Sequence, residues 1–226
     1  MAEHLSIIPI LLFSVIIHEM SHGWMALRLG DPTARDMGRL TLNPIPHIDI
    51  VGSIIVPLLS FFSAGRVFIA WAKPVPVNPY NFSDMRRDDL LVSVVGPLSN
   101  LVMALACTIM VMLLGVAAPF VAGADTRILT ELWTFFMQMF LGGVYLNVGL
   151  AVFNLIPIPP LDGSHVLASL LPEDMADGYR RVGFLGILLI LFLLRVPAFN
   201  AAFGYVLGAV FAPFGALIGL VIPLTP

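Results

Sequence analysis

Charged residues are scarce in this sequence. Only 11% of its 226 residues are Asp, Glu, Lys or Arg, whereas 59% are hydrophobic. Soluble domains have roughly 25% charged and 45–50% apolar residues. The eleven Lys and Arg residues are scattered over polar segments, and the formal net charge is −3. These proportions exclude an ordinary soluble domain, and no basic patch suited to nucleic acid is present.

Cysteine is almost absent. Cys107 stands alone within an apolar block, which excludes a disulfide framework inside the chain and favours a small core residue over a reactive thiol. The first four residues also lack the basic region of a secretory signal peptide. We therefore expect the first apolar segment to be retained as a working helix.

Long hydrophobic blocks are what the sequence has instead. A membrane-spanning helix needs about 20 mostly apolar residues, and several blocks are that long. The blocks cover residues 5–27, 48–71, 90–122, 132–161, 182–196 and 198–224. The polar connections are too short for an additional soluble domain. The sequence predicts an all-α polytopic membrane protein with about five to six transmembrane helices, forming a single domain over residues 1–226.

The placement of Lys and Arg predicts the orientation. Nine of the eleven basic residues fall in segments 28–47, 66–90 and 161–181, and an excess of basic residues is typical of cytoplasmic loops. The N-terminus is therefore expected outside. Segments 28–47 and 66–90 share one side if the chain between them re-enters the membrane as a hairpin, or forms a short β element, within residues 33–80. A plain crossing helix at 48–71 is the competing interpretation.

The strongest chemical signal is His18-Glu19-Met20-Ser21-His22, inside the first apolar block. Residues four apart share a helix face, so His18 and His22 can bind one metal ion. Glu19 lies beside them, where a carboxylate can take a proton from an activated water. Ionisable groups at membrane depth are costly and usually functional. The alternative is a cluster that only satisfies its own hydrogen bonds.

Asp162 is the best candidate for a third ligand, which catalytic zinc sites usually have. It follows a segment with three prolines, which break helical hydrogen bonding and allow a carboxylate to turn inward. A simple turn residue before Gly163 is the alternative. The predicted topology places Asp162 and the two histidines at similar depth, toward the cytoplasmic ends of their helices. Glu131 and Glu173 are the other candidates, but neither lies in a comparable segment.

Three motifs together resemble those of the site-2 protease family of intramembrane zinc metalloproteases. They are HEMSH at 18–22, GPLSN at 96–100 and NLIPIPPLDG at 154–163. Segments 40–49 and 71–79 are similar to those of the compact prokaryotic members, which have no peptide-binding PDZ domain. The resemblance implies one zinc ion per chain.

The resemblance also implies a role for each site residue. His18, His22 and Asp162 are expected to bind the zinc ion, with Glu19 as the catalytic base. Asn154 is expected to hold substrate or the developing oxyanion. Asn100 is a second candidate for substrate contact, and a hydrogen bond to another helix is its alternative.

The expected function is hydrolysis of peptide bonds within or near transmembrane segments of other membrane proteins. We expect a multi-pass protein of the cell membrane, with its active site toward the cytoplasm and with the lipid bilayer and transmembrane substrates as its partners. A zinc-binding membrane transporter and a non-catalytic pseudoprotease are the alternatives. The polar residues concentrate in two motifs instead of forming a path, and Glu19 is retained, so both alternatives are weaker.

Three features outside these motifs have weaker assignments. His165 is either a hydrogen-bond partner of a zinc ligand or a solvated loop residue. His47 has a small chance of reaching the site. Residues 71–79 contain three prolines and are expected to be extended. Such a segment can pair with an unwound substrate or serve as a rigid loop.

Overall fold

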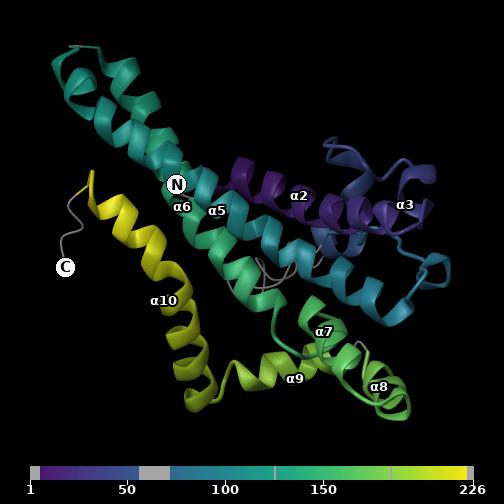
Figure 1. Cartoon of the computed structure of the whole chain (residues 1–226). Helices are drawn as coiled ribbons and strands as arrows, with labels where there is room; N and C mark the ends of the chain where they lie inside the picture. The colour runs from purple at the N-terminus through teal and green to yellow at the C-terminus, as the bar shows by residue number, and fades with distance from the viewer. Residues whose placement is uncertain (1–5, 56–71, 125, 184, 223–226) are drawn as a thin grey trace.

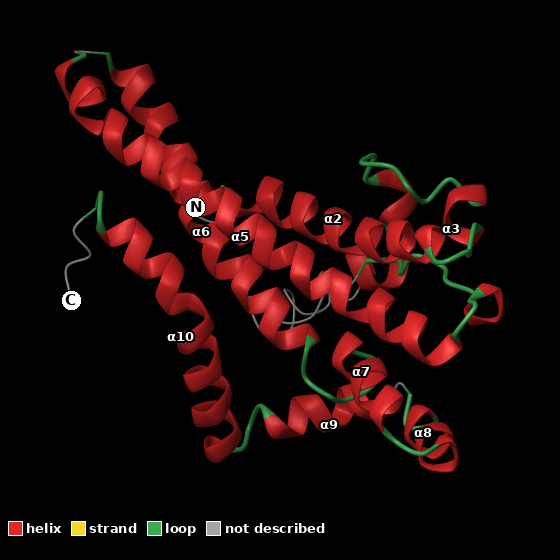
Figure 2. Cartoon of the chain, viewed as in Figure 1, coloured by secondary structure: helices red, strands yellow, loops and turns green. Residues whose placement is uncertain are grey.

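The computed structural model describes residues 6–55, 72–124, 126–183 and 185–222, and these contain helices and no strand (Figure 2). The longer helices are α2 (Ile7–Arg28), α5 (Met85–Gly123), α6 (Arg127–Asn154) and α10 (Pro197–Gly219). The shorter ones are α3 (Thr33–Asp36), η1 (Ile45–His47), η2 (Ile50–Ile55), η3 (Pro79–Asn81), α7 (Asp162–Leu170), α8 (Glu173–Arg180) and α9 (Leu185–Leu193). The predicted all-α fold class is confirmed.

Helices α2, α5 and α6 pack along one another and form the centre of the molecule (Figure 1). Their close approach depends on small residues, as is common between membrane helices. A Cβ added to Gly143 of α6 would lie 2.9 Å from both Cys107 Sγ on α5 and Ile10 Cγ1 on α2. Cys107 is a free, buried residue of this core, as the sequence predicted. Helix α10 packs against α5 and α6 through Phe211 and Phe214.

Among the described residues, four helices, α2, α5, α6 and α10, are long and apolar enough to cross a membrane. Large apolar side chains such as Val102, Phe120 and Leu188 are exposed on the outside, where lipid replaces water as the solvent. The predicted count was five to six. Block 182–196 forms α9, whose nine residues are too few for a bilayer core about 30 Å thick. Most of block 48–71 lies outside the described residues. The protein is a multi-pass membrane protein.

The chain leaves α2 and enters α5 at the same end of the bundle (Figure 1). Between them, the described residues form α3, η1, η2, η3 and a loop over 72–78, with no strand among them. The predicted re-entrant hairpin falls mainly on 56–71, outside the described residues. Helix α5 begins where Asp84 caps it, because the Asp84 carboxylate accepts the Arg87 backbone N–H at 3.0 Å.

Asp31 joins the end of α2 to the loop that precedes α5. Its side chain is fully buried; Oδ1 accepts from the Thr33 N–H and the Asn81 side chain, and Oδ2 accepts from the Asn78 N–H. Burial alone would raise the pKa of Asp31, but these hydrogen bonds outweigh it and lower the pKa below its ordinary value. The ionised carboxylate thus holds residues 72–81 against α2.

Candidate metal centre

His18 and His22 lie one turn apart on α2 and are both buried. Their Nε2 atoms face each other at 3.1 Å, and the two rings meet edge to face with their centroids 4.7 Å apart. The helical spacing predicted this pairing, because residues i and i+4 share a helix face. Helix α5 covers the pair, because Val92, Gly96 and Asn100 all contact the two rings.

Asp162, far from the two histidines in the sequence, lies next to both of them in the structure. Helix α6 ends at Asn154, the proline-rich segment turns the chain, and α7 begins at Asp162. Asp162 Oδ2 lies 3.2 Å from His18 Nε2, and Oδ1 lies 3.4 Å from His22 Nε2. A Cβ on Gly163 would collide with the Leu155 carbonyl, so only glycine allows this tight turn. Within the described residues, these three side chains form the one group placed to share a metal ion.

The hydrogen bonds of the two histidines determine which ring nitrogens are free. His22 Nδ1 lies 2.7 Å from the Val92 carbonyl oxygen, and His18 Nδ1 lies 2.6 Å from Asn100 Oδ1. Carbonyl oxygens only accept hydrogen bonds, so each Nδ1 carries the proton and each Nε2 presents a lone pair. Asp162 Oδ2 is buried without a hydrogen-bond partner.

Lone pairs on three facing donors repel unless a cation lies between them. Ligand atoms about 2.1 Å from a tetrahedral zinc ion are roughly 3.4 Å apart, which matches the observed separations of 3.1 to 3.4 Å. Imidazole nitrogen and carboxylate oxygen are also common zinc ligands. The residues present therefore fit a zinc ion.

Glu19 lies beside this cluster and is held by the loop before α5. Its Oε2 accepts the Val75 backbone N–H at 2.7 Å. Arg39 in turn donates from Nη2 to the Lys73 carbonyl at 2.7 Å and to the Pro74 carbonyl at 3.2 Å. Residues 72–78, part of the segment expected to be extended, have no helix or strand assigned. The loop thus lies across the catalytic candidate and fixes one oxygen of its carboxylate.

The two asparagines predicted to contact substrate occupy different environments. Asn154 is partly exposed in the last turn of α6, and its Nδ2 donates to the Leu150 carbonyl at 3.0 Å. Asn100 is fully buried, with Oδ1 facing His18 and Nδ2 donating to Asn147 Oδ1 at 3.0 Å. The structure therefore shows Asn154 bonded only within its own helix among the described contacts, whereas Asn100 contacts His18 directly.

The other two histidines among the described residues, His47 and His165, lie outside the cluster. His165 Nδ1 lies 3.1 Å from Asp89 Oδ2, and this partner raises the pKa of His165 above its ordinary value. His47 is buried with Nε2 2.9 Å from the Thr41 carbonyl, and its own carbonyl accepts the Lys73 N–H. His47 therefore supports the loop that covers Glu19.

Sequence reasoning missed the role of Gly96. The structure packs it against both histidines of the cluster: a Cβ there would lie 2.8 Å from His18 Cε1 and closer still to His22 Cε1 and Nε2. In the sequence, Gly96 stood out only as part of the GPLSN motif at 96–100. The signal available was its spacing to Asn100, since four residues along a helix bring both onto the face that meets α2.

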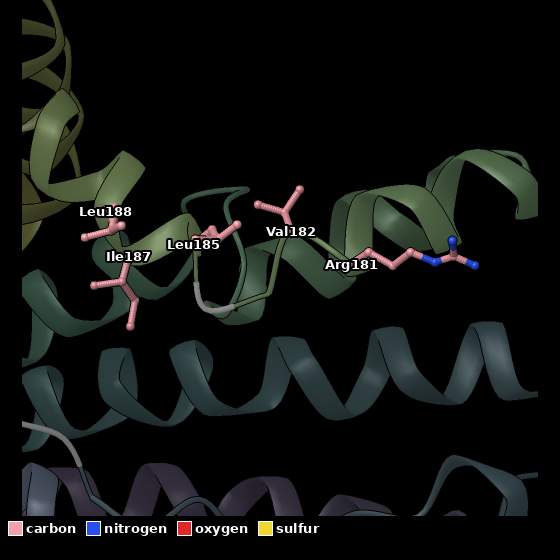
Figure 3. A pocket seen from close by; sticks show the side chains of 5 residues that line it. All are labelled: Arg181, Val182, Leu185, Ile187 and Leu188. Carbon is pink, nitrogen blue, oxygen red and sulfur yellow. The ribbon is translucent and has the colours of Figure 1, made fainter.

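A cavity of about 360 Å³ lies elsewhere, at the junction of α8 and α9 (Figure 3). Its lining side chains are Arg181, Val182, Leu185, Ile187 and Leu188. None of them belongs to the histidine–aspartate cluster, and four are apolar. The candidate metal site is therefore the histidine–aspartate cluster and not this cavity.

A buried two-histidine, one-carboxylate centre with a second carboxylate beside it, inside a bundle of membrane-spanning helices, defines a membrane metalloprotease. The comparisons with known proteins agree with this class. The model of peptidase family M50 matches residues 81–194. The chain belongs to this family, and the resemblance to site-2 proteases is confirmed.

Individual relatives match a larger share of the chain than the family model does. "Putative zinc metalloprotease YwhC" of Bacillus subtilis is 33% identical over 197 residues, covering 85% of this chain and 83% of the relative. "Putative zinc metalloprotease Rip2" of Mycolicibacterium smegmatis is 32% identical over 192 residues, covering 85% of this chain and 67% of the relative. The protein of the same name from Mycobacterium tuberculosis is 28% identical over 197 residues. No solved structure matches the chain.

Proposed function

We propose that this protein is an intramembrane zinc metalloprotease that hydrolyses peptide bonds within or near transmembrane segments of other membrane proteins. One zinc ion per chain is held by His18, His22 and Asp162. The observation that carries the proposal is their convergence: donor atoms from α2 and α7, 140 residues apart in sequence between His22 and Asp162, all lie within 4.8 Å of one another. The family and its zinc metalloprotease relatives support the same metal.

Glu19 is the proposed general base. A zinc ion, when bound, supplies a Lewis acid beside it. Among the described residues, Val75 engages Oε2 alone, so Oε1 remains for the attacking water. Glu19 takes the water proton at Oε1 and returns it to the nitrogen of the leaving amine. The Val75 N–H holds the carboxylate in one orientation during both transfers.

Asn154 is the proposed substrate or oxyanion contact. It lies in the turn of α6 that leads directly into the segment carrying Asp162. Its amide now donates to the Leu150 carbonyl, an oxygen within the same helix, so the amide can turn toward a substrate carbonyl at small cost. Removal of one oxyanion donor typically costs about 3 kcal/mol in transition-state stabilisation.

The substrate must unwind locally to be cleaved. In a membrane helix every backbone carbonyl is already hydrogen-bonded within the segment, and neighbouring turns shield the peptide bond. Transmembrane segments with Gly, Pro or polar residues near the cleavage point unwind most readily. We therefore propose such segments as the substrate class.

The active site is proposed to face the cytoplasm, with the N-terminus outside the cell. Helices α2 and α6 end, and α5 and α10 begin, toward the end of the bundle that carries α7 and α8 (Figure 1). Arg28, Arg86, Arg87 and Arg180 lie at this end, whereas Arg127 begins α6 at the other. The excess of basic residues supports a cytoplasmic position.

The test compares purified wild type with Glu19→Gln for zinc content and for cleavage of a model transmembrane substrate. We expect about one zinc per chain in both proteins and cleavage in the wild type alone. Glu131→Gln is the matched control, because Glu131 is exposed and paired with Arg127 at the far end of α6. Unchanged cleavage by Glu19→Gln would exclude Glu19 as the base. Absence of zinc from the wild type would exclude the proposed centre.

A further inference from the structure

A chain of buried polar side chains runs from His18 into the core. His18 Nδ1 meets Asn100 Oδ1 at 2.6 Å, and Asn100 Nδ2 donates to Asn147 Oδ1 at 3.0 Å. Asn147 Nδ2 donates to Ser14 Oγ at 2.8 Å and to the Gly143 carbonyl at 2.9 Å. The Ser14 hydroxyl donates to the Ile10 carbonyl at 2.7 Å. Ser14, Asn100 and Asn147 are all 0% exposed.

The direction of each hydrogen bond between these polar side chains follows from the end farthest from His18, where Asn147 bonds to Ser14 and Gly143. The Gly143 carbonyl can only accept, and the Ser14 hydroxyl has already given its proton to Ile10. Both therefore require the NH₂ group of Asn147, which leaves Asn147 Oδ1 facing Asn100. Asn100 must then present its own NH₂ to Asn147 and its oxygen to His18.

The two ligand histidines differ in how their proton is placed. His22 Nδ1 faces the Val92 backbone carbonyl. A backbone carbonyl oxygen can only accept a hydrogen bond, so no further residue is needed to orient it. His18 faces a side-chain amide, whose oxygen and nitrogen exchange places on a half-turn. A turned Asn100 would present NH₂ to His18 Nδ1, the ring proton would move to Nε2, and the nitrogen that faces Asp162 would lose its lone pair.

We propose that Asn147, supported by Ser14, is a positioning residue that holds the Asn100 amide in one orientation and so keeps His18 Nε2 available as a metal ligand. This inference rests on the proposed zinc site. Hydrogen-bond partners behind a ligand histidine determine its tautomer and typically change metal affinity 10- to 100-fold when removed. The relay also joins α2, α5 and α6 at one point, so the ligand's chemistry depends on the correct packing of all three helices.

The test measures zinc affinity in detergent by competition with a chromogenic chelator. Asn147→Leu removes the directing oxygen and is expected to weaken zinc binding about 10- to 100-fold. Adding Asn100→Asp to it is expected to restore most of the affinity, because a carboxylate accepts from His18 through either oxygen and needs no directing partner. The matched control is Thr108→Val: Thr108 is equally buried on α5, but its hydroxyl bonds only to the Ala104 carbonyl. It should bind zinc as the wild type does.

The double variant separates positioning from packing. Loss of core packing at Asn147 would not be repaired at position 100, so equally weak binding by the single and double variants overturns the proposal. Wild-type affinity in Asn147→Leu also overturns it. If the wild type itself binds no zinc, the proposed function fails instead.

A second measurement needs no variant at position 147. In metal-free protein labelled with ¹⁵N-histidine, at a pH where the imidazoles are neutral, His18 is expected to carry its proton on Nδ1. The sequence has five histidines, and the His18 signals are those missing from a His18→Asn variant. A proton on Nε2 in the wild type refutes the directed chain.

Discussion

Gly96→Ala adds one methyl group at the back of the proposed zinc centre. The new Cβ lies 2.8 Å from His18 Cε1 and closer still to the His22 ring, whereas ordinary contact begins near 3.4 Å. His18 must therefore retreat by about 0.6 Å and His22 by more. Zinc ligand distances tolerate deviations of only about 0.2 Å, so the centre cannot keep its geometry unless α2 and α5 move apart.

The expected result is loss of zinc affinity and of proteolysis. A misplacement of about 1 Å at a reacting centre costs on the order of 100-fold in rate, and we expect cleavage of a model transmembrane substrate to fall at least that far. Zinc binding, measured by chelator competition, should weaken about 10-fold or more. The measurement needs no assumption about the natural substrate.

The matched control is Gly149→Ala, in the C-terminal part of α6. A Cβ there meets nothing within 4 Å, so the same substitution in a membrane helix should leave zinc binding and cleavage unchanged. Wild-type zinc affinity in Gly96→Ala would refute the reasoning, because the site would then have room that the structure does not show.

Three further predictions concern the metal, the loop and pH. Asp162→Ala should abolish the rise in melting temperature that zinc produces, because only a ligand couples zinc binding to folding. Glu173→Ala should keep this rise. Chelation of zinc from the wild type should lower its melting temperature to the value of Asp162→Ala. Asp31→Ala leaves the Asn78 N–H and the Asn81 amide without their acceptor and should destabilise the protein by about 3 kcal/mol, measured by unfolding, with faster proteolysis within 72–84. In the wild type the Asp31 contribution should be full above pH about 4 and fall away as acid titrates the lowered pKa. Because the pKa of His165 is raised, its pairing with Asp89 stabilises the fold fully below pH about 6.5, and this stabilisation is lost as pH rises through the folded-state pKa. The difference in melting temperature between wild type and His165→Gln should therefore be largest in acid. A difference that does not change with pH would contradict this prediction.

Local patterns predicted that His18 and His22 lie together, because such patterns act within one helix. His18 and His22 are four residues apart, and α-helical geometry alone puts them on one face. Block length predicted α2, α5, α6 and α10, since the bilayer sets the length of a spanning helix. Block 182–196 was the exception. It is as apolar as a membrane-spanning helix, but the helix that it forms, α9, has only nine residues.

Contacts between distant segments could not be deduced in the same way. Nothing in the spacing of Val75 and Glu19 indicates that the amide of one meets the carboxylate of the other, because the contact depends on how Arg39 and Asp31 hold the intervening loop. Asn147 was equally hidden, as a polar residue in an apolar helix has many potential partners. Which partner it finds depends on the packing of α6 against α2 and α5.

The sequence by itself determined that this is a helical membrane protein of the site-2 protease type with a histidine pair and a carboxylate as candidate ligands. Composition and short motifs decide these properties, because they depend on the solvent and on neighbours within one turn. Only the tertiary structure decided that Asp162 meets the pair, that Gly96 leaves room for both rings, and that Asn147 and Asn100 form a buried hydrogen-bonded chain to His18. Each of these needs atoms from different helices within about 3 Å, a condition that hydrogen-bond and packing distances impose and that only the folded chain meets.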